Sequence, residues 1–221
     1  MIQGNTLVEE PVKVHEWRKI KYKEKTAYDI IKRVFDIVAS LFALILLSPL
    51  LLVISIIVFV SDWGNPLFVQ DRVGKNGKKF RMYKFRSMYK NAEQVKDELM
   101  SQNEADGPLF KITNDPRVTK IGSFIRKTSI DELPQIINIL KGEMSVIGPR
   151  PFIPSEQAQL PDERLLVKPG LSCYWQIGGK NSLSVEEQME LDFKYIEDRS
   201  FLTDLKIVFR TIGAVFKSDN Y

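Results

Sequence analysis

Hydrophobic side chains gather in one long apolar segment toward the N-terminal side of this chain. Residues 37–60 contain no charged side chain. A helix over these residues would be about 36 Å long, enough to cross a bilayer core of about 30 Å. The run is too long for a cleaved signal peptide, and a polar segment precedes it. We therefore expect a polar arm over residues 1–28 on the membrane surface, a membrane-inserted helix over residues 29–62, and a cytosolic domain over residues 63–221.

Two features bear on whether the apolar segment spans the membrane. Pro49 lies at its centre, where it removes one helical hydrogen bond and predicts a bend, although Ser48 can supply a substitute. Lys32 and Arg33 precede the segment, and a series of Lys and Arg follows it between residues 72 and 86. The positive-inside rule then favours both ends on the cytoplasmic face. On these grounds a re-entrant helix–break–helix and a kinked single-pass anchor are both open.

Beyond the apolar segment the pattern predicts short strands and then a helix. Alternating apolar positions predict strands over residues 67–73 and 79–86, joined by a turn at Lys75-Asn76-Gly77. Apolar residues at helical spacing from Met88 to Leu99 predict a helix, followed by a polar loop.

Within the membrane helix, Asp36 lies three residues after Arg33, so an ion pair on the helix face is expected.

The C-terminal third predicts a short strand and then two helices. Turn signals at residues 168–170 and 178–179 bracket the strand. Ser184 and Glu187 form a capping box at the start of the first helix. The last helix carries an apolar stripe that suits either core packing or a membrane interface, at Leu202, Leu205, Phe209, Ile212 and Phe216. Together these elements predict an α+β fold of helices and short strands.

Composition narrows the possible chemistry. Lys and Arg outnumber Asp and Glu by 32 to 28, for a net charge of +4, which favours anionic partners. Cys173 and His15 are the only residues of their kinds, so a disulfide framework, a zinc site and a Ser-His-Asp triad are nearly excluded. The sequence contains no Walker A, GxGxxG or DxD motif. An enzyme built on this chain would therefore use carboxylates, Lys, Arg or a hard metal ion.

An adjacent pair of acidic residues, Asp131 and Glu132, is the main candidate for such chemistry. Ser129 and Glu132 match a capping box, so the pair could belong to an ordinary helix start. Pro134 instead favours a helix that begins at Asp131, because proline is tolerated in the first turn and not further in. Gly142 is expected to end this helix. Two carboxylates at a helix N-terminus would lie where the helix dipole favours anions.

Basic residues surround this acidic pair in the sequence. Arg126 and Lys127 precede it, and Arg150 follows in the sequence GPRP after a short predicted strand, MSVIG. Carboxylates that serve as nucleophile or metal ligand, together with cations that neutralise phosphate charge, are what phosphoryl transfer requires. The pattern therefore indicates a phosphoryl-transfer site.

Five motifs, in order, resemble the monotopic bacterial phosphoglycosyl transferases, also called bacterial sugar transferases. The likeness covers about residues 28–216 and is carried by KRVFDIVASLFALILLSPLLL, QDRVGKNGKKFRMYKFRSM, NDPRVTKIG, IRKTSIDELPQIINILKGEMSVIGPRP and KPGLSCYWQI. The chain looks like the small form of the family, which consists of the catalytic domain. It departs from many relatives in SCYWQIGGKN, where these carry an SGR or NGR turn, so the resemblance implies no particular sugar.

The resemblance implies transfer of sugar-1-phosphate from a UDP-sugar to undecaprenyl phosphate, with release of UMP and dependence on Mg²⁺ or Mn²⁺. It implies a covalent phosphosugar intermediate on Asp131, with Glu132 as its partner in metal binding or proton handling. Ser48-Pro49 matches the break of a re-entrant membrane helix, which places both helix ends on the cytosolic face of the bacterial inner membrane. The phosphates and nucleotide would be bound by Arg126, Arg150, Pro149 and Pro151. Lys84 and Arg86 are weaker candidates for phosphate contact.

Two other classes of function remain as alternatives. A catalytically silent membrane protein could bind polyprenyl phosphate or nucleotide and organise a glycan-assembly complex with the same fold. A basic nucleic-acid binder with one membrane helix would need no acidic pair, so no nucleic-acid partner is expected. The intact acidic pair favours the transferase over both.

Overall fold

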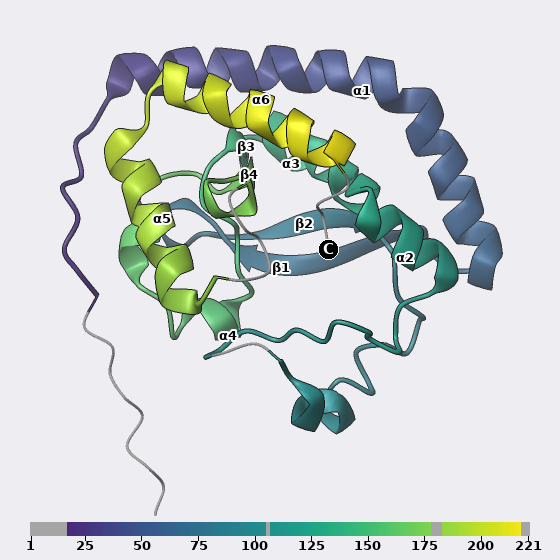
Figure 1. Cartoon of the computed structure of the whole chain (residues 1–221). Coiled ribbons are helices and arrows are strands. Elements are labelled where there is room, and N and C mark those ends of the chain that lie inside the picture. Colours follow the sequence, from purple (N-terminus) through teal and green to yellow (C-terminus); the bar gives the residue numbers. More distant parts are fainter. Residues whose placement is uncertain (1–16, 105–106, 178–182, 218–221) are drawn as a thin grey trace, which may run out of the picture.

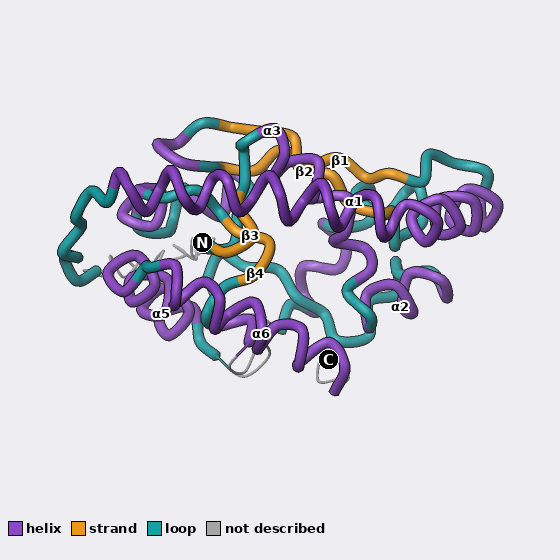
Figure 2. Tube along the Cα trace, turned by 90° about the horizontal axis from the view of Figure 1, so that it is seen from above, coloured by secondary structure: helices purple, strands orange, loops and turns teal. Residues whose placement is uncertain are grey.

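The computed structural model describes residues 17–104, 107–177 and 183–217, and His15 and Gly178-Gly179 lie outside these ranges. The fold is a mixture of helices and short strands, as the sequence predicts, and the strands within these ranges form two small sheets. α1 and α6 lie next to each other along the top of the molecule in Figure 1. From above, α1 runs between the β1–β2 ribbon on one side and α5 and α6 on the other (Figure 2).

α1 (Thr26–Asp62) is one helix of 37 residues, long and apolar enough to cross a membrane by length and composition. The helix is not interrupted at Ser48-Pro49, so the expected break into two helices is wrong. Pro49 cannot donate to the carbonyl of Ile45, but the Ser48 hydroxyl donates to that carbonyl at 2.8 Å. The helix nevertheless bends along its length (Figure 1), as a proline inside a helix predicts.

The N-terminal half of α1 is fixed to the rest of the fold by polar contacts. The buried Asp36 carboxylate accepts hydrogen bonds from the Ser145 hydroxyl and the Val146 N–H, both at 3.0 Å. Arg33 donates to the carbonyls of Ile139 and Leu140 at 2.6 and 2.7 Å. The expected ion pair between Arg33 and Asp36 is therefore wrong, because each side chain has a partner in a distant element.

The C-terminal half of α1 packs against the same folded body. Its buried residues Ile54 and Val58 form a hydrophobic cluster with Phe85 and Ile125. Asp62, the last residue of α1, forms an ion pair with Arg86. Between the two attached ends the apolar side chains are exposed, including Phe42, Ile45, Leu46, Leu52 and Ile56.

The arm before α1 packs on the folded body where it is described. Trp17 contacts Phe193 edge to face, and Arg18 forms ion pairs with Glu190 and Glu197 of α5 (Val185–Asp198). At Trp17 and Arg18 the arm therefore faces α5. α1 begins at Thr26, three residues before the predicted start.

β1 (Leu67–Val73) and β2 (Lys79–Phe85) form the predicted antiparallel hairpin. Asn76 and Gly77 in the turn have φ of 57° and 74°, a region that Asn and Gly adopt most readily. The hairpin places Lys84 near one end of the ribbon and the turn at the other.

The helix expected from Met88 to Leu99 is absent; turns and a 3₁₀ helix over Asp97–Gln102 take its place. Long-range contacts override the local periodicity here. Tyr89 donates its N–H to the carbonyl of Arg117, and Met88 pairs with Val118 in an isolated bridge. The buried Arg117 side chain lies against this segment and donates to the carbonyl of Ala92.

The middle of the chain brings the acidic pair and the second sheet together. α2 (Lys120–Lys127) leads to a 3₁₀ helix over Ile130–Gln135, which continues into α3 (Ile136–Lys141). α3 ends at Gly142, with φ of 83°, as expected. The predicted strand MSVIG is β3 (Ser145–Ile147), which pairs in parallel with β4 (Gly170–Ser172).

The remaining helices close the fold on the side of β3 and β4. A single turn, α4 (Pro154–Gln157), follows the GPRP sequence. α5 begins at the predicted capping box of Ser184 and Glu187, and its apolar face is buried. α6 (Phe201–Lys217) buries Asp204 and Ile207, whereas Leu202, Phe209 and Ile212 of the predicted stripe are exposed. Core packing is therefore not the role of this stripe.

Candidate active site

The acidic pair lies in the 3₁₀ turn between α2 and α3, rather than at the start of an α-helix. Ser129 precedes the turn with φ of 54° and makes no side-chain capping hydrogen bond, and the α-helix begins only at Ile136. The expected helix start at Asp131 is therefore wrong, and so is the alternative start at Ser129. Pro134 accounts for the absence of the earlier start at Ser129, since it has no N–H to donate to the carbonyl of Ile130.

Glu132 is held by two cations. One of its carboxylate oxygens, Oε1, lies 3.0 Å from Lys84 Nζ and 3.2 Å from Arg150 Nη1. Burial lowers the pKa of Lys84, and Glu132 opposes that effect. Burial also disfavours charge on Arg150, but the pairing with Glu132 raises its pKa overall. The sequence makes Lys84 only a weaker candidate for phosphate contact. Its position on β2 nevertheless brings its ammonium group against the Glu132 carboxylate.

Asp131 has a different environment from its neighbour. Its side chain is buried, with 9% of the residue surface exposed, and its carboxylate makes no hydrogen bond or ion pair with any residue that the structure describes. Burial raises the pKa of Asp131, while the charge of Lys84 opposes the shift. Asp131 is thus a buried carboxyl group whose oxygens are not committed to a partner, next to a carboxylate that is.

The GPRP sequence lies beside the acidic pair, and its backbone is held by hydrogen bonds to other parts of the fold. The carbonyl of Pro149 accepts the N–H of Gly170 at 2.9 Å, and the carbonyl of Pro151 accepts Arg72 Nη1 at 3.2 Å. Arg150 projects from between the two prolines toward Glu132. The prolines therefore position Arg150 through backbone contacts.

The other two predicted arginines have partners of their own. Arg126 Nε donates to the Ser87 hydroxyl at 2.8 Å, and its charge acts on Asp131. Arg86 forms its ion pair with Asp62 and so attaches the end of α1 to β2. The structure thus gathers Lys84, Arg126 and Arg150 around the acidic pair, and gives Arg86 an anchoring contact.

Two arginines near the site were missed by the sequence analysis. Arg72 donates to the carbonyl of Pro151, and burial together with the charge of Arg150 lowers its pKa to about 10. Arg164 is buried, pairs with Asp192 at 2.7 Å and donates to the carbonyl of Arg150 at 2.6 Å. Arg72 belongs to the basic hairpin, which was a sequence signal. The partners that tie Arg164 to the site and to α5 lie 14 and 28 residues away, and no local pattern indicates them.

The donor set fits a hard divalent cation better than zinc. No cluster of three or more His, Cys, Asp or Glu that could hold a metal occurs within the described part of the chain. Mg²⁺ is commonly bound by one or two carboxylates together with water and substrate phosphates, and Asp131 and Glu132 supply such a pair. Zinc sites need three or four protein ligands, most often Cys or His.

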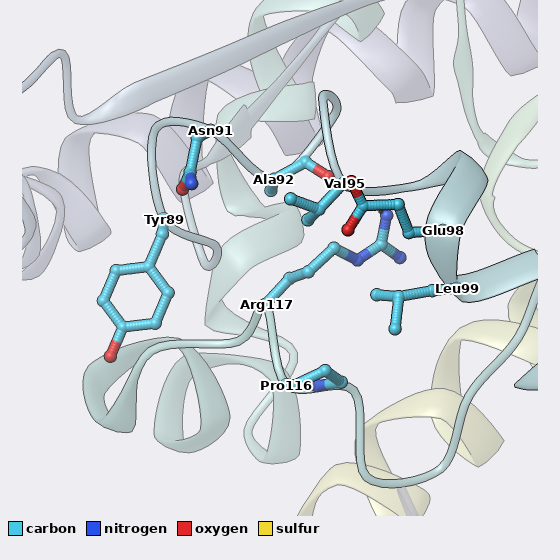
Figure 3. A pocket seen from close by; sticks show the side chains of 8 residues that line it. All are labelled: Tyr89, Asn91, Ala92, Val95, Glu98, Leu99, Pro116 and Arg117. Atoms are coloured by element: carbon cyan, nitrogen blue, oxygen red, sulfur yellow. Dashed lines mark hydrogen bonds between the residues drawn. The ribbon is translucent and has the colours of Figure 1, made fainter.

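A cavity of about 280 Å³ lies apart from the acidic pair, between the segment after β2 and the segment before α2. Arg117 crosses it, and Ala92, Val95, Leu99 and Pro116 form its apolar walls (Figure 3). Arg117 is already ion-paired with Asp115 at 2.7 Å and lies over the ring of Phe110. None of the predicted site residues lines this cavity.

The chain is similar to known bacterial sugar transferases. Residues 27–218 match the family model described as bacterial sugar transferase. The chain is 43% identical over 197 residues to the UDP-galactose-lipid carrier transferase of Erwinia amylovora, covering 86% of this chain and 41% of that protein. It is 40% identical over 205 residues to the undecaprenyl-phosphate galactose phosphotransferase of Salmonella typhimurium, covering 88% of this chain and 42% of that protein.

A shorter relative is matched over most of its own length. The exopolysaccharide production protein ExoY of Rhizobium meliloti is 43% identical over 192 residues, covering 83% of this chain and 84% of that protein. The chain therefore spans less than half the length of the first two relatives and most of the third.

Proposed function

This chain belongs to the bacterial sugar transferases, and we propose that it transfers sugar-1-phosphate from a UDP-sugar to undecaprenyl phosphate, releasing UMP. The observation that carries the proposal is the contrast within the acidic pair. Glu132 is held by Lys84 and Arg150, while the neighbouring Asp131 carboxylate is buried and has no partner among the described residues. A carboxylate nucleophile must have uncommitted oxygens, and cations nearby must offset repulsion from its anionic target.

The proposed reaction has two displacements at one phosphorus atom. An Asp131 oxygen attacks the β-phosphorus of the UDP-sugar, the bond from that phosphorus to the bridging oxygen breaks, and UMP leaves with the bonding electrons. A phosphate oxygen of undecaprenyl phosphate then attacks the same phosphorus. The bond to Asp131 breaks, which restores the carboxylate and yields the lipid-linked diphosphate sugar. Covalent catalysis of this kind divides one difficult transfer into two easier ones.

The roles of the surrounding residues follow from their positions. Lys84 and Arg150 keep the Glu132 carboxylate in place and contribute positive charge beside the reacting phosphates. Asp131 and Glu132 would hold Mg²⁺ or Mn²⁺, which as a Lewis acid neutralises phosphate charge. Arg126, with its charge directed at Asp131, would bind a phosphate oxygen.

A nucleotide-release assay tests the proposed reaction. Purified protein in detergent, with Mg²⁺ and undecaprenyl phosphate, is expected to release UMP from one or a few members of a panel of UDP-sugars. UDP as the product would indicate ordinary glycosyl transfer and contradict the proposal. No release from any sugar by folded protein would favour the silent scaffold function.

We further propose that α1 enters the membrane and returns to the cytosolic face. Both halves of α1 pack on one folded body, through Asp36 and Ser145 at one end and Asp62 and Arg86 at the other. A straight crossing would place these contacts on opposite sides of the bilayer. The exposed apolar middle of α1 and the exposed stripe on α6 would then face lipid.

Cysteine labelling tests this topology. Lys19 and Lys78 are exposed and lie before and after α1, so each is replaced by cysteine in a Cys173→Ser background. A membrane-impermeant maleimide is expected to label neither site in intact cells and both sites after the cells are broken. Labelling of one site from outside would overturn the re-entrant arrangement.

A further inference from the structure

A basic groove lies beneath the N-terminal half of α1. It consists of two cavities, of about 80 and 450 Å³, which share Tyr22, Asp29, Arg33 and Lys75 in their walls. The shared walls make the cavities one continuous groove between α1, the arm before it and the turn of the β1–β2 hairpin. Lys168, next to β4, lines its inner part.

Three cations meet in this groove. The Arg33 guanidinium and the Lys168 ammonium lie 3.3 and 3.5 Å from the position that a Cβ on Gly142 would occupy, so the two groups are neighbours. Burial lowers the pKa of Lys168, and the charges of Arg33 and Lys75 lower it further. Lys168 and Lys75 form no side-chain hydrogen bond or ion pair with the described residues. The charges of Asp36 and Asp29 oppose the lowering of the Lys168 pKa, but neither residue forms an ion pair with Lys168 or Lys75.

Acidic residues in the groove leave this charge incompletely balanced. Asp36 is committed to Ser145 and Val146. Glu24 and Asp29 line the outer part. Lys32 is paired with Asp204, which lies outside the lining. The other charged residues of the lining still include more cations than anions, namely Arg33, Lys75, Lys168 and Arg199 against Glu24, Asp29 and Asp36.

An apolar wall adjoins the cations. Ile30 and Val34 line the larger cavity and are 61% and 57% exposed. Both lie on α1, the helix whose apolar surface indicates membrane contact. A ligand for this groove would thus present an anionic group to the lysines and a hydrocarbon chain to α1, which is the chemistry of a phospholipid.

We propose that this groove binds a membrane glycerophospholipid, with its phosphate held by Arg33, Lys75 and Lys168 and its acyl chains along Ile30 and Val34. The groove is distinct from the candidate active site. Lys75 lies in the hairpin turn, and Lys84 lies roughly 17 Å further along β2 from the turn's end at Lys79. A lipid at this position would fix the N-terminal half of α1 to the cytosolic surface of the bilayer.

The test is a titration of the full chain in non-ionic detergent with dihexanoyl phosphatidylglycerol, followed by calorimetry. The wild-type protein is expected to bind it saturably, and Lys75→Gln/Lys168→Gln to bind at least about tenfold more weakly. The control Lys78→Gln/Lys79→Gln removes the same charge from exposed residues of the same hairpin and is expected to bind as the wild type does. Equal weakening in both variants, or no saturable binding, would overturn the proposal.

A second arm separates a lipid from a free anion. Inorganic phosphate is expected to compete weakly, because it makes no contact with Ile30 and Val34. Competition at the affinity of the lipid would indicate a phosphate site and contradict the lipid assignment. The titration contains neither UDP-sugar nor undecaprenyl phosphate, and the Lys75→Gln/Lys168→Gln variant is expected to release UMP at the wild-type rate. Failure of the lipid-binding proposal can therefore be told apart from failure of the proposed transferase activity.

Discussion

Replacing Asp131 by asparagine is expected to lower the rate of UMP release by at least about a thousandfold, because an amide cannot act as the nucleophile. The protein should remain folded. Asparagine has nearly the same shape, and the Asp131 carboxylate has no partner to lose among the described residues. Since burial raises the pKa of Asp131, its charged form is disfavoured by folding, and the neutral amide should be neutral or slightly stabilising. Nucleotide release and thermal unfolding measure the two effects.

The matched control for this substitution is Asp71→Asn. Asp71 is an exposed carboxylate on β1, so the change in charge and volume is the same and UMP release should be unaffected. Intact-protein mass spectrometry without acceptor lipid gives a second readout. The wild type is expected to gain the mass of one sugar phosphate, and Asp131→Asn to gain none. An adduct that persists in Asp131→Asn and disappears in Glu132→Gln would reverse the roles assigned to the pair.

Local patterns in the sequence predict the elements whose cause is local. The alternation of side chains and the Asn76-Gly77 turn specify the β1–β2 hairpin, and the structure confirms it. The capping box at Ser184 and the glycine at position 142 likewise mark the start of α5 and the end of α3. In each case the physical reason lies within a few residues of the feature.

The errors arise where distant contacts compete with local pattern. Helical spacing from Met88 to Leu99 was overridden by hydrogen bonds to residues near Arg117, which no single-sequence pattern shows. Arg33 and Asp36 have the spacing of a helix-face pair, but each has a partner more than 100 residues away. The exposure of the α6 stripe reflects the burial of Asp204 on the opposite face, where it pairs with Lys32.

The residues of the candidate site likewise divide into those that local motifs indicate and those that only distant contacts explain. Sequence motifs point to Asp131, Glu132 and Arg150, because proline, acidic and basic residues stand close together there. That Lys84 reaches Glu132 depends on the packing of β2 against the 3₁₀ turn. That Arg164 supports Arg150 depends on α5, which begins more than twenty residues later. The acidic pair and Arg150 were therefore easier to find than the residues that hold them in place.

Loss of this support should have the largest effect on stability. Arg164→Met is expected to lower the free energy of unfolding by about 3–5 kcal/mol, since it leaves the Asp192 carboxylate buried without its cation. For a chain of this size that corresponds to a decrease in Tm of roughly 6–20 °C. UMP release should fall as well at temperatures where the variant is folded, because Arg164 no longer donates to the carbonyl of Arg150.

Two further variants separate the buried pair from a general effect of removing charge. Arg164→Met/Asp192→Leu removes both charges and should regain part of the lost stability, because no unpaired ion remains buried. Arg18→Met breaks ion pairs to Glu190 and Glu197 on the same helix, α5, but these are substantially exposed. Its effect should stay below about 1 kcal/mol. Tm is measured for Arg164→Met and Arg18→Met in the same detergent. Equal losses would contradict the prediction, because they would show that burial of the Arg164–Asp192 pair adds nothing to its contribution to stability.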